Sequence, residues 1–311
     1  MLTREEKLLF RIKKDGLGVE VGASHAPIAP KRAGYNVHII DHATLDELVR
    51  KYENDGVKLD NIEDVDFVWR GEKYADLTGH THHYDWIIAS HVIEHVPNLV
   101  GFLNSCDEIL KDDGVLSLAI PDIRFCFDHF RPISGLSRVI DAHLQNHVVH
   151  TPGSVAEFML NLVNRDEQPG WAEGTSLAER YTFINSRDSV VQGLQNHPES
   201  SEYVDCHAWC FTPHSFRLLI SDLFDLGLIQ MRELHFFPSE GCEFHIALSR
   251  NGNGSGLNRL QLLSAVENDL ARGLEPSLLL EAGFKAVSAK ASRRFRLAAG
   301  RPRQMLKKLL G

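Results

Sequence analysis

The feature that most constrains the fold is an alternation of short apolar runs with amphipathic stretches over the first 120 or so residues. The apolar runs predict strands at residues 17–22, 35–41, 84–90 and 115–120, with a weaker one at 66–69. Amphipathic stretches at 45–52 and 100–110 predict helices, because their apolar residues recur at helical spacing. Strands joined by helical crossovers predict a mostly parallel sheet covered by helices on both faces.

The second half of the chain closes this sheet after a long interruption. Between residues 123 and 205 the pattern loosens into helical segments and polar turns, which we interpret as a lid over an acceptor site. A strong helix at 211–226, with a Thr212-Pro213 start, precedes closing strands at 234–238 and 243–248. We therefore expect one doubly wound α/β domain over 1–250, with the helical lid at 123–205 inserted in it. Residues 251–311 then supply a Gly/Asn-rich linker, a helix at 257–270 and a basic tail.

Charge and cysteine content exclude several classes of protein. The net charge is -9, but residues 285–311 hold nine Lys or Arg and no acid, so residues 1–284 carry -18. Such an acidic body repels nucleic acid, and we expect no nucleic-acid partner. The basic tail predicts peripheral contact with an anionic membrane surface. No run reaches the length of a membrane span, and five cysteines are too few for a disulfide framework, which favours a cytoplasmic protein.

Three features converge on one edge of the predicted sheet. In such sheets ligands bind beyond the carboxyl ends of the strands. Gly22 ends the first strand and permits a sharp turn, and Asp41 ends the second, where its carboxylate can bind a ribose diol. Ser90 and His91 end the third clear strand and would form the floor of the pocket. No G-x-G-x-x-G or phosphate-binding loop is present, so a ligand with a ribose but without phosphate is favoured.

These residues resemble a known family, the class I S-adenosylmethionine-dependent methyltransferases. The resemblance covers roughly residues 15–125, through the stretches 19–23, 39–41, 84–97 and 110–116. Its most specific part is the run Ser-His-Val-Ile-Glu-His-Val-Pro at 90–97, which is similar to methyltransferases of bacterial surface-polysaccharide and glycan assembly. The resemblance implies a Rossmann-like methyltransferase fold with S-adenosylmethionine as the cofactor.

The resemblance also implies roles for individual residues. Glu20 would support the first loop and the donor's amino-acid end, Asp41 would hold the ribose, and residues 69–72 would lie near the adenine. The predicted cofactor-binding residues are Glu20, Gly22, Ala23, Asp41, His42, Arg70, Gly71, Ser90 and His91. Two positions depart from the family pattern: residues 24–27 (Ser-His-Ala-Pro) replace the later glycines, and Arg70 stands near the place of an acid.

The expected reaction is methyl transfer to an oxygen, namely a hydroxyl of a sugar or glycan, so the expected partner is a small-molecule or glycan acceptor. Histidine is a suitable base because its pKa lies near neutrality, and the candidates are His91, His95 and His207. Because the sulfonium donor is already activated, alignment of acceptor and methyl group could supply much of the rate. The alternatives left open are methylation of nitrogen or of a small metabolite, and a non-catalytic donor-binding partner of a glycan-assembly complex.

Other residues allow rival interpretations. The run from His91 to His95 matches the H-x-x-E-H motif of zinc proteases, but it follows a buried strand and soon meets Pro97 rather than lying in a long helix. A simpler alternative is that Glu94 and His95 cap the next helix. Cys206 and Cys210 lack a second pair at zinc-ligand spacing, so we predict no metal. The acidic and basic residues of 122–131 would either contact the acceptor or form surface salt bridges.

Overall fold

The computed structural model describes residues 2–174, 181–196 and 203–273. The basic segment 285–311, to which we assign membrane contact, lies outside the described residues. The described residues up to Glu267 form one compact unit, and residues 268–273 belong to a second. Within the described ranges, no helix combines the length and the apolar composition needed to cross a membrane.

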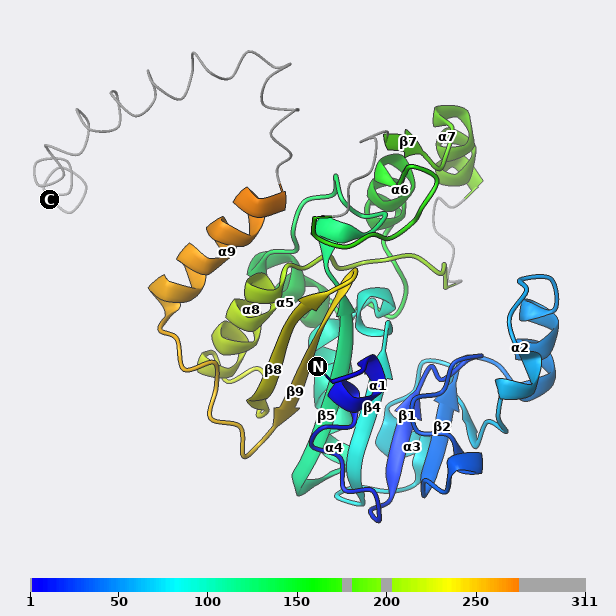
Figure 1. Cartoon of the computed structure of the whole chain (residues 1–311), viewed down its shortest axis with the longest axis vertical. Coiled ribbons are helices and arrows are strands. Elements are labelled where there is room, and N and C mark those ends of the chain that lie inside the picture. The colour runs from blue at the N-terminus through cyan, green and yellow to red at the C-terminus, as the bar shows by residue number, and fades with distance from the viewer. Residues whose placement is uncertain (1, 175–180, 197–202, 274–311) are drawn as a thin grey trace, which may run out of the picture. The chain divides into compact units, whose positions relative to one another are not determined.

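Helices and strands alternate as the sequence pattern predicts (Figure 1). The strands are β1 (Gly18–Val21), β2 (Val37–Asp41), β3 (Phe67–Val68), β4 (Tyr84–Ser90), β5 (Leu110–Pro121), β6 (Val163–Arg165), β7 (Tyr181–Phe183), β8 (Arg232–Glu240) and β9 (Glu243–Ser249). The helices are α1 (Arg4–Leu8), α2 (Leu45–Tyr52), α3 (Tyr74–Thr78), α4 (Leu99–Ile109), α5 (Leu136–Leu144), α6 (Pro152–Asn161), α7 (Arg187–Asn196), α8 (Pro213–Asp225) and α9 (Arg259–Gly273).

The described residues form a seven-stranded sheet in the order β3-β2-β1-β4-β5-β9-β8. The five strands from β3 to β5 run parallel, while β9 is antiparallel to both β5 and β8. The strand order reverses between β1 and β4, where the crevice of a doubly wound sheet forms. The predicted α/β doubly wound fold is confirmed.

Side chains of the central strands point alternately to two cores, one on each face of the sheet. Ile87 and Ala89 join the larger core with residues of α3, α4, α5 and α8. Trp86 and Ile88 point the other way and pack with Leu8 of α1. The Trp86 ring leaves no room on the neighbouring strand, because a Cβ on Gly18 would lie 2.1 Å from it. Glycine at this strand position therefore allows a bulky residue to fill the core.

The carboxyl ends of β1, β2, β4 and β5 meet at one edge of the sheet (Figure 1). The chain leaves β5 at this edge, after Pro121, and enters the region predicted as a lid. There α5, α6 and α7 accompany the small antiparallel hairpin of β6 and β7. It returns at Phe211, which pairs with Asp122, just before α8. The insertion thus begins and ends beside the edge where the ligand is predicted.

Candidate functional site

The turn after β1 allows a ligand to approach the backbone closely. Gly22 has a φ of +66°, and a Cβ added there would lie 2.9 Å from Cγ2 of Val92. Both the positive φ and the close approach of Val92 make a side chain unfavourable at this position. Because Val92 follows β4, the loop after β1 lies close to the loop after β4. Ala23, the next predicted donor residue, is buried.

Glu20 supports this loop from within the protein. It is 2% exposed, and its carboxylate accepts hydrogen bonds from the backbone N–H groups of Ile28 (2.6 Å) and Ala29 (2.9 Å). Burial raises the pKa of Glu20 to about 7, although the two N–H donors act in the opposite direction. The structure therefore gives Glu20 the loop-supporting part of its predicted role.

Asp41 joins the ends of two strands. Its Oδ2 accepts a hydrogen bond from the backbone N–H of Ser24 (3.1 Å), and its Oδ1 accepts one from the N–H of His42 (2.7 Å). The His42 ring lies against the same carboxylate, with Nδ1 2.7 Å from Oδ1. The carboxylate is thus fixed at the carboxyl end of β2, between the loops that follow β1 and β2.

The segment predicted to lie near the adenine is held beside Asp41. The Trp69 N–H donates to the Asp41 carbonyl at 2.8 Å, and the Arg70 guanidinium donates to the His42 carbonyl. Gly71 follows with a φ of +111°. The structure therefore brings together Gly22, Asp41, His42, Arg70 and Gly71, as the sequence predicts for the donor edge.

Ser90 and His91 end β4 and are held by residues distant in sequence. Arg4 donates to Oγ of Ser90 at 2.6 Å and pairs with Glu243 at 2.6 Å. His91, with a φ of +54°, places Nε2 2.6 Å from Glu243 and Nδ1 3.4 Å from Glu94. Burial alone would lower the pKa of His91, but these two carboxylates raise it to about 9. His91 is therefore protonated near neutral pH and is a poor general base.

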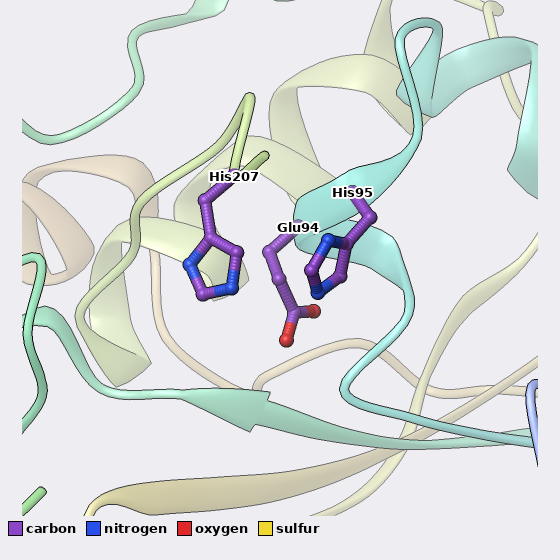
Figure 2. A group of neighbouring side chains, drawn as sticks. All are labelled: Glu94, His95 and His207. Carbon is purple, nitrogen blue, oxygen red and sulfur yellow. The ribbon is translucent and has the colours of Figure 1, made fainter. Parts of the chain in front are cut away.

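Three further side chains gather beyond His91: Glu94, His95 and His207 (Figure 2). One potential ligand atom from each lies within 4.8 Å of the other two. Glu94 and His95 belong to a short 3-10 helix (Ile93–His95), whereas His207 comes from the segment that returns before α8. Figure 2 shows both rings turned toward the carboxylate between them. The backbone N–H of Ala208 donates to the Glu94 carbonyl at 2.6 Å and fixes the two segments together.

Each imidazole of this cluster also meets a second carboxylate. His207 Nδ1 lies 2.5 Å from Oδ2 of Asp128, and His95 Nδ1 lies 2.9 Å from Oδ1 of Asp205. Burial alone would lower the pKa of His95, but Asp205 and Glu94 raise it. Burial would raise the pKa of Asp128, but His207 and Arg131 hold it below its usual range. Orienting carboxylates of this kind fix the rotation of an imidazole ring.

A chain of contacts connects the cluster to the donor edge. Asp205, which pairs with His95, lies 3.8 Å from Nζ of Lys51. The same ammonium is 3.4 Å from Nε2 of His42, which in turn contacts Asp41. Four successive contacts thus link His95 of the cluster to Asp41, the residue predicted to bind the ribose.

A pocket of about 240 Å³ is lined by Pro97, by residues of the insertion and by the segment that returns before α8. Polar and apolar residues both line it, and apolar atoms supply the larger part of its surface: Pro97, Ser137, Arg138, Asp141, Ala142, His147, Val149, His150, Thr151, Ser154, Ala208 and Trp209. Ala208 directly follows His207, so the pocket borders the cluster. Its volume is smaller than the roughly 300–1,000 Å³ typical of drug-sized ligands, which favours one small polar unit.

Comparison with known proteins identifies the catalytic region. Residues 16–118 match the family model described as "Methyltransferase domain". This region is a methyltransferase domain. The chain is accordingly an S-adenosylmethionine-dependent methyltransferase, with S-adenosylmethionine as its cofactor. The residues at this edge fit such a group: the turn at Gly22 has no Cβ to crowd a ligand, and the Asp41 carboxylate would be its hydrogen-bond acceptor.

The chain is also similar to solved structures at low identity. A protein from Pyrococcus horikoshii has 13% identity, covering 78% of this chain and 86% of its own, with a TM-score of 0.39. A protein from Rhodobacter sphaeroides, provisionally named a zinc-dependent alcohol dehydrogenase, has 11% identity over 79% and 89% of the two chains and a TM-score of 0.42. A methyltransferase from Aquifex aeolicus has 16% identity over 45% and 79%, with a TM-score of 0.31. A search of curated proteins found no match.

The geometry of the site also decides between rival interpretations of the residues from His91 to His95. The protease-type H-x-x-E-H arrangement does not form, because His91 faces Glu243 and the metal-capable cluster contains His207 in its place. Glu94 and His95 do not cap α4, since Asn98 accepts the capping hydrogen bond from Gly101. These two residues are instead directed into the site.

The charged residues after β5 form ion pairs, but they are buried rather than on the surface. Asp122 accepts hydrogen bonds from Arg124 and Ser239, and Asp128 pairs with Arg131 at 2.8 Å. All of these except Ser239 are buried. Burial raises the pKa of Cys206 to about 12, and neither Cys206 nor Cys210 belongs to the cluster of potential metal ligands found in the described residues.

Sequence reasoning missed the residues that reach the site from far away. Arg4 contacts Glu243 across 239 positions, and Glu243 contacts His91 across 152. Asp205 and Lys51 were likewise not predicted as neighbours of the site. The H-x-x-E-H run does indicate that titratable side chains gather after β4. The residues that contact them come from distant parts of the sequence and are identified only by the structure.

Proposed function

We propose that this methyltransferase transfers the methyl group of S-adenosylmethionine to a hydroxyl oxygen of a sugar or glycan. One observation carries the proposal: one carboxylate and two imidazoles (the buried Glu94 and His207 and the half-buried His95) gather after β4, next to a small pocket that Ala208 lines. Groups of this kind promote the loss of a proton from an acceptor.

A hydroxyl acceptor needs this help. Its proton must leave as the new carbon–oxygen bond forms, and a positioned basic or electrophilic group accelerates such a transfer. An uncharged amine attacks through a free electron pair before it loses a proton. The cluster is also rigid, because Asp128 and Asp205 orient its two imidazoles. His91, which the sequence includes among the candidates, is protonated and instead holds Glu94 and Glu243 in place.

The donor side follows from the residues at the carboxyl ends of β1 and β2. S-adenosylmethionine supplies an electrophilic methyl group on a sulfonium centre when it is bound. Asp41 would accept hydrogen bonds from the ribose hydroxyls, and the turn at Gly22 would let backbone groups approach the donor. Arg70 and Gly71 would border the adenine, and Ser90 would form the floor of the site.

The acceptor side favours a polyol. The lining of the pocket offers hydroxyl groups (Ser137, Thr151 and Ser154), a cation (Arg138) and an anion (Asp141), which together can both donate and accept hydrogen bonds. The resemblance of residues 90–97 to methyltransferases of surface-polysaccharide assembly points to the same substrate class.

The test is transfer of isotopically labelled methyl from S-adenosylmethionine to panels of sugars, glycans and amines, followed by mapping of the methylated atom by mass spectrometry and NMR. We expect label on a hydroxyl oxygen of a sugar. His207→Ala should reduce the rate by about 100-fold or more, in line with loss of a proton-transfer group. His80→Asn, which changes an exposed histidine outside the site, should leave the rate unchanged. Label on nitrogen, or donor binding without transfer to any acceptor, would contradict the proposal.

A further inference from the structure

The carboxylate of Glu94 is buried without hydrogen bonds in the described part of the chain, an arrangement that requires a nearby positive charge. It is 1% exposed, and neither of its oxygens has a hydrogen-bond partner among the described residues. Its closest positive neighbour is His91, whose Nδ1 lies 3.4 Å from Oε1. Burying a charge without hydrogen bonds costs several kcal/mol unless a cation or a donor compensates for it. The carboxylate is thus short of positive charge on the side away from His91.

Two imidazoles occupy that side. One ring nitrogen of His95, one of His207 and one carboxylate oxygen of Glu94 lie within 4.8 Å of one another. Both rings face the carboxylate (Figure 2). His207 Nδ1 is hydrogen-bonded to Asp128 and His95 Nδ1 lies 2.9 Å from Asp205, so each Nε2 is left for the centre of the cluster. In metal sites a ligating histidine gives its other nitrogen to a carboxylate in this way.

We infer that Glu94, His95 and His207 form a binding site for a divalent transition-metal ion, with zinc as the best match. Two imidazoles and one carboxylate are the ligand set of several catalytic zinc sites. With three protein ligands, such an ion would keep a coordination position for a further ligand. Imidazole ligands favour zinc over magnesium or calcium, which prefer oxygen.

The groups around the ligands support this assignment. Asp128 is itself fixed by Arg131, whose Nη1 donates to Oδ1 at 2.8 Å, and Arg131 also pairs with Glu157 at 3.1 Å. Outer carboxylates held this firmly set the direction of the ligating nitrogen. The arrangement differs from the H-x-x-E-H protease motif because His91 is replaced by His207, which comes from the end of the insertion.

The site stands on geometry alone, but its role in activating a hydroxyl rests on the proposed function. A zinc ion held by Glu94, His95 and His207 would supply Lewis-acid chemistry: it would lower the pKa of an acceptor hydroxyl bound to it, and the proton released on methyl transfer would pass to water. The ion would then act together with the donor edge, to which Asp205 and Lys51 connect it.

The experiment is calorimetric titration of the chelator-treated full chain with Zn²⁺, together with Co²⁺ titration followed by visible absorption. We expect one Zn²⁺ per chain and the absorption bands of four-coordinate Co²⁺. Glu94→Gln and His207→Ala should weaken Zn²⁺ binding at least 100-fold. Asp128→Asn, which alters an outer carboxylate only, should weaken it about 10- to 100-fold.

A control variant excludes adventitious binding to surface histidines. The His80 and His83 rings stack at 4.0 Å and are the kind of pair that holds zinc weakly. His80→Asn should therefore leave the stoichiometric site intact. S-adenosylhomocysteine binding and circular dichroism verify that each variant is folded. No stoichiometric Zn²⁺ binding, or binding that His80→Asn removes and Glu94→Gln does not, would overturn the inference.

The outcomes also separate this inference from the proposed function. Zinc binding that depends on Glu94, combined with transfer to nitrogen only, would support the metal site and contradict hydroxyl methylation. Hydroxyl methylation by a wild-type protein that binds no zinc would support the proposed function and contradict the metal site.

Discussion

The Asp41 carboxylate accepts hydrogen bonds from the backbone N–H groups of Ser24 and His42. It also lies at the end of β2, where the ribose of the donor is expected. We predict that Asp41→Ala weakens binding of S-adenosylhomocysteine by about 2 kcal/mol, or about 30-fold, because it removes hydrogen bonds to a charged acceptor. Calorimetric titration measures this loss.

Asp46→Ala is the matched control for this change. It removes the same charge from an exposed position on α2 and should leave donor affinity unchanged. Equal affinity of wild type and a folded Asp41→Ala variant would show that the ribose site lies elsewhere.

Glu20 predicts a pH dependence of stability. Its pKa is about 7 in the folded protein, against the usual value near 4.5. The folded state therefore binds its proton more tightly than the unfolded state does. The resulting stabilisation is complete below pH 4.5 and is lost as the pH rises through 7, by about 3 kcal/mol in total.

Comparison with Glu20→Gln isolates this effect, because the amide is isosteric and does not titrate. Denaturant unfolding at pH 5 and at pH 8 should show the free energy of unfolding of wild type falling relative to that of the variant by 2–3 kcal/mol. A constant difference between the two proteins would mean that Glu20 keeps its ordinary pKa in the folded state.

Among the secondary-structure elements, those with a strong apolar period could be predicted from sequence. Strand β4 and helix α2 have the predicted bounds, and the start of α8 at Thr212-Pro213 is confirmed. The hairpin of β6 and β7 and helix α1 were not predicted. Both lie in polar or charged sequence, where tertiary contacts rather than local periodicity decide the structure. The capping box of Thr3 and Glu6 was the available signal for α1.

Helix α1 is held to the sheet by one buried side chain. Leu8 is 1% exposed and packs in the core that contains Trp86 and Ile88. We predict that Leu8→Ala lowers the free energy of unfolding by about 2–4 kcal/mol, through lost burial and the cavity left behind. Leu2→Ala, which changes a 39% exposed leucine at the same end of the chain, should change it by less than about 0.5 kcal/mol. Equal effects in denaturant unfolding would show that α1 does not dock on the sheet.

At the scale of the whole molecule, the sequence indicates which edge of the sheet is functional but not which residues meet there. Gly22, Asp41 and Ser90 are found where the strand pattern places them, because the ends of parallel strands share one edge. No comparable rule predicts which residues contact Glu94, His95 and His207. His207 reaches Asp128 across 79 positions, and its approach to Glu94 depends on the path of the insertion. No periodicity or motif spacing encodes that path.

The uneven distribution of charge along the chain leads to the last prediction. Residues 285–311 carry nine basic and no acidic side chains, while the rest of the sequence is strongly acidic. Each Lys or Arg near an anionic membrane contributes about 1 kcal/mol to the free energy of membrane binding, and this attraction is screened within a Debye length of about 10 Å at 0.1 M salt.

The full chain should therefore sediment with vesicles rich in phosphatidylserine at low salt and be released by salt. A chain ending at residue 284 should stay in the supernatant, because its net charge of -18 is repelled. Vesicles of phosphatidylcholine alone are the control, and equal sedimentation of the two chains would contradict membrane contact through the tail.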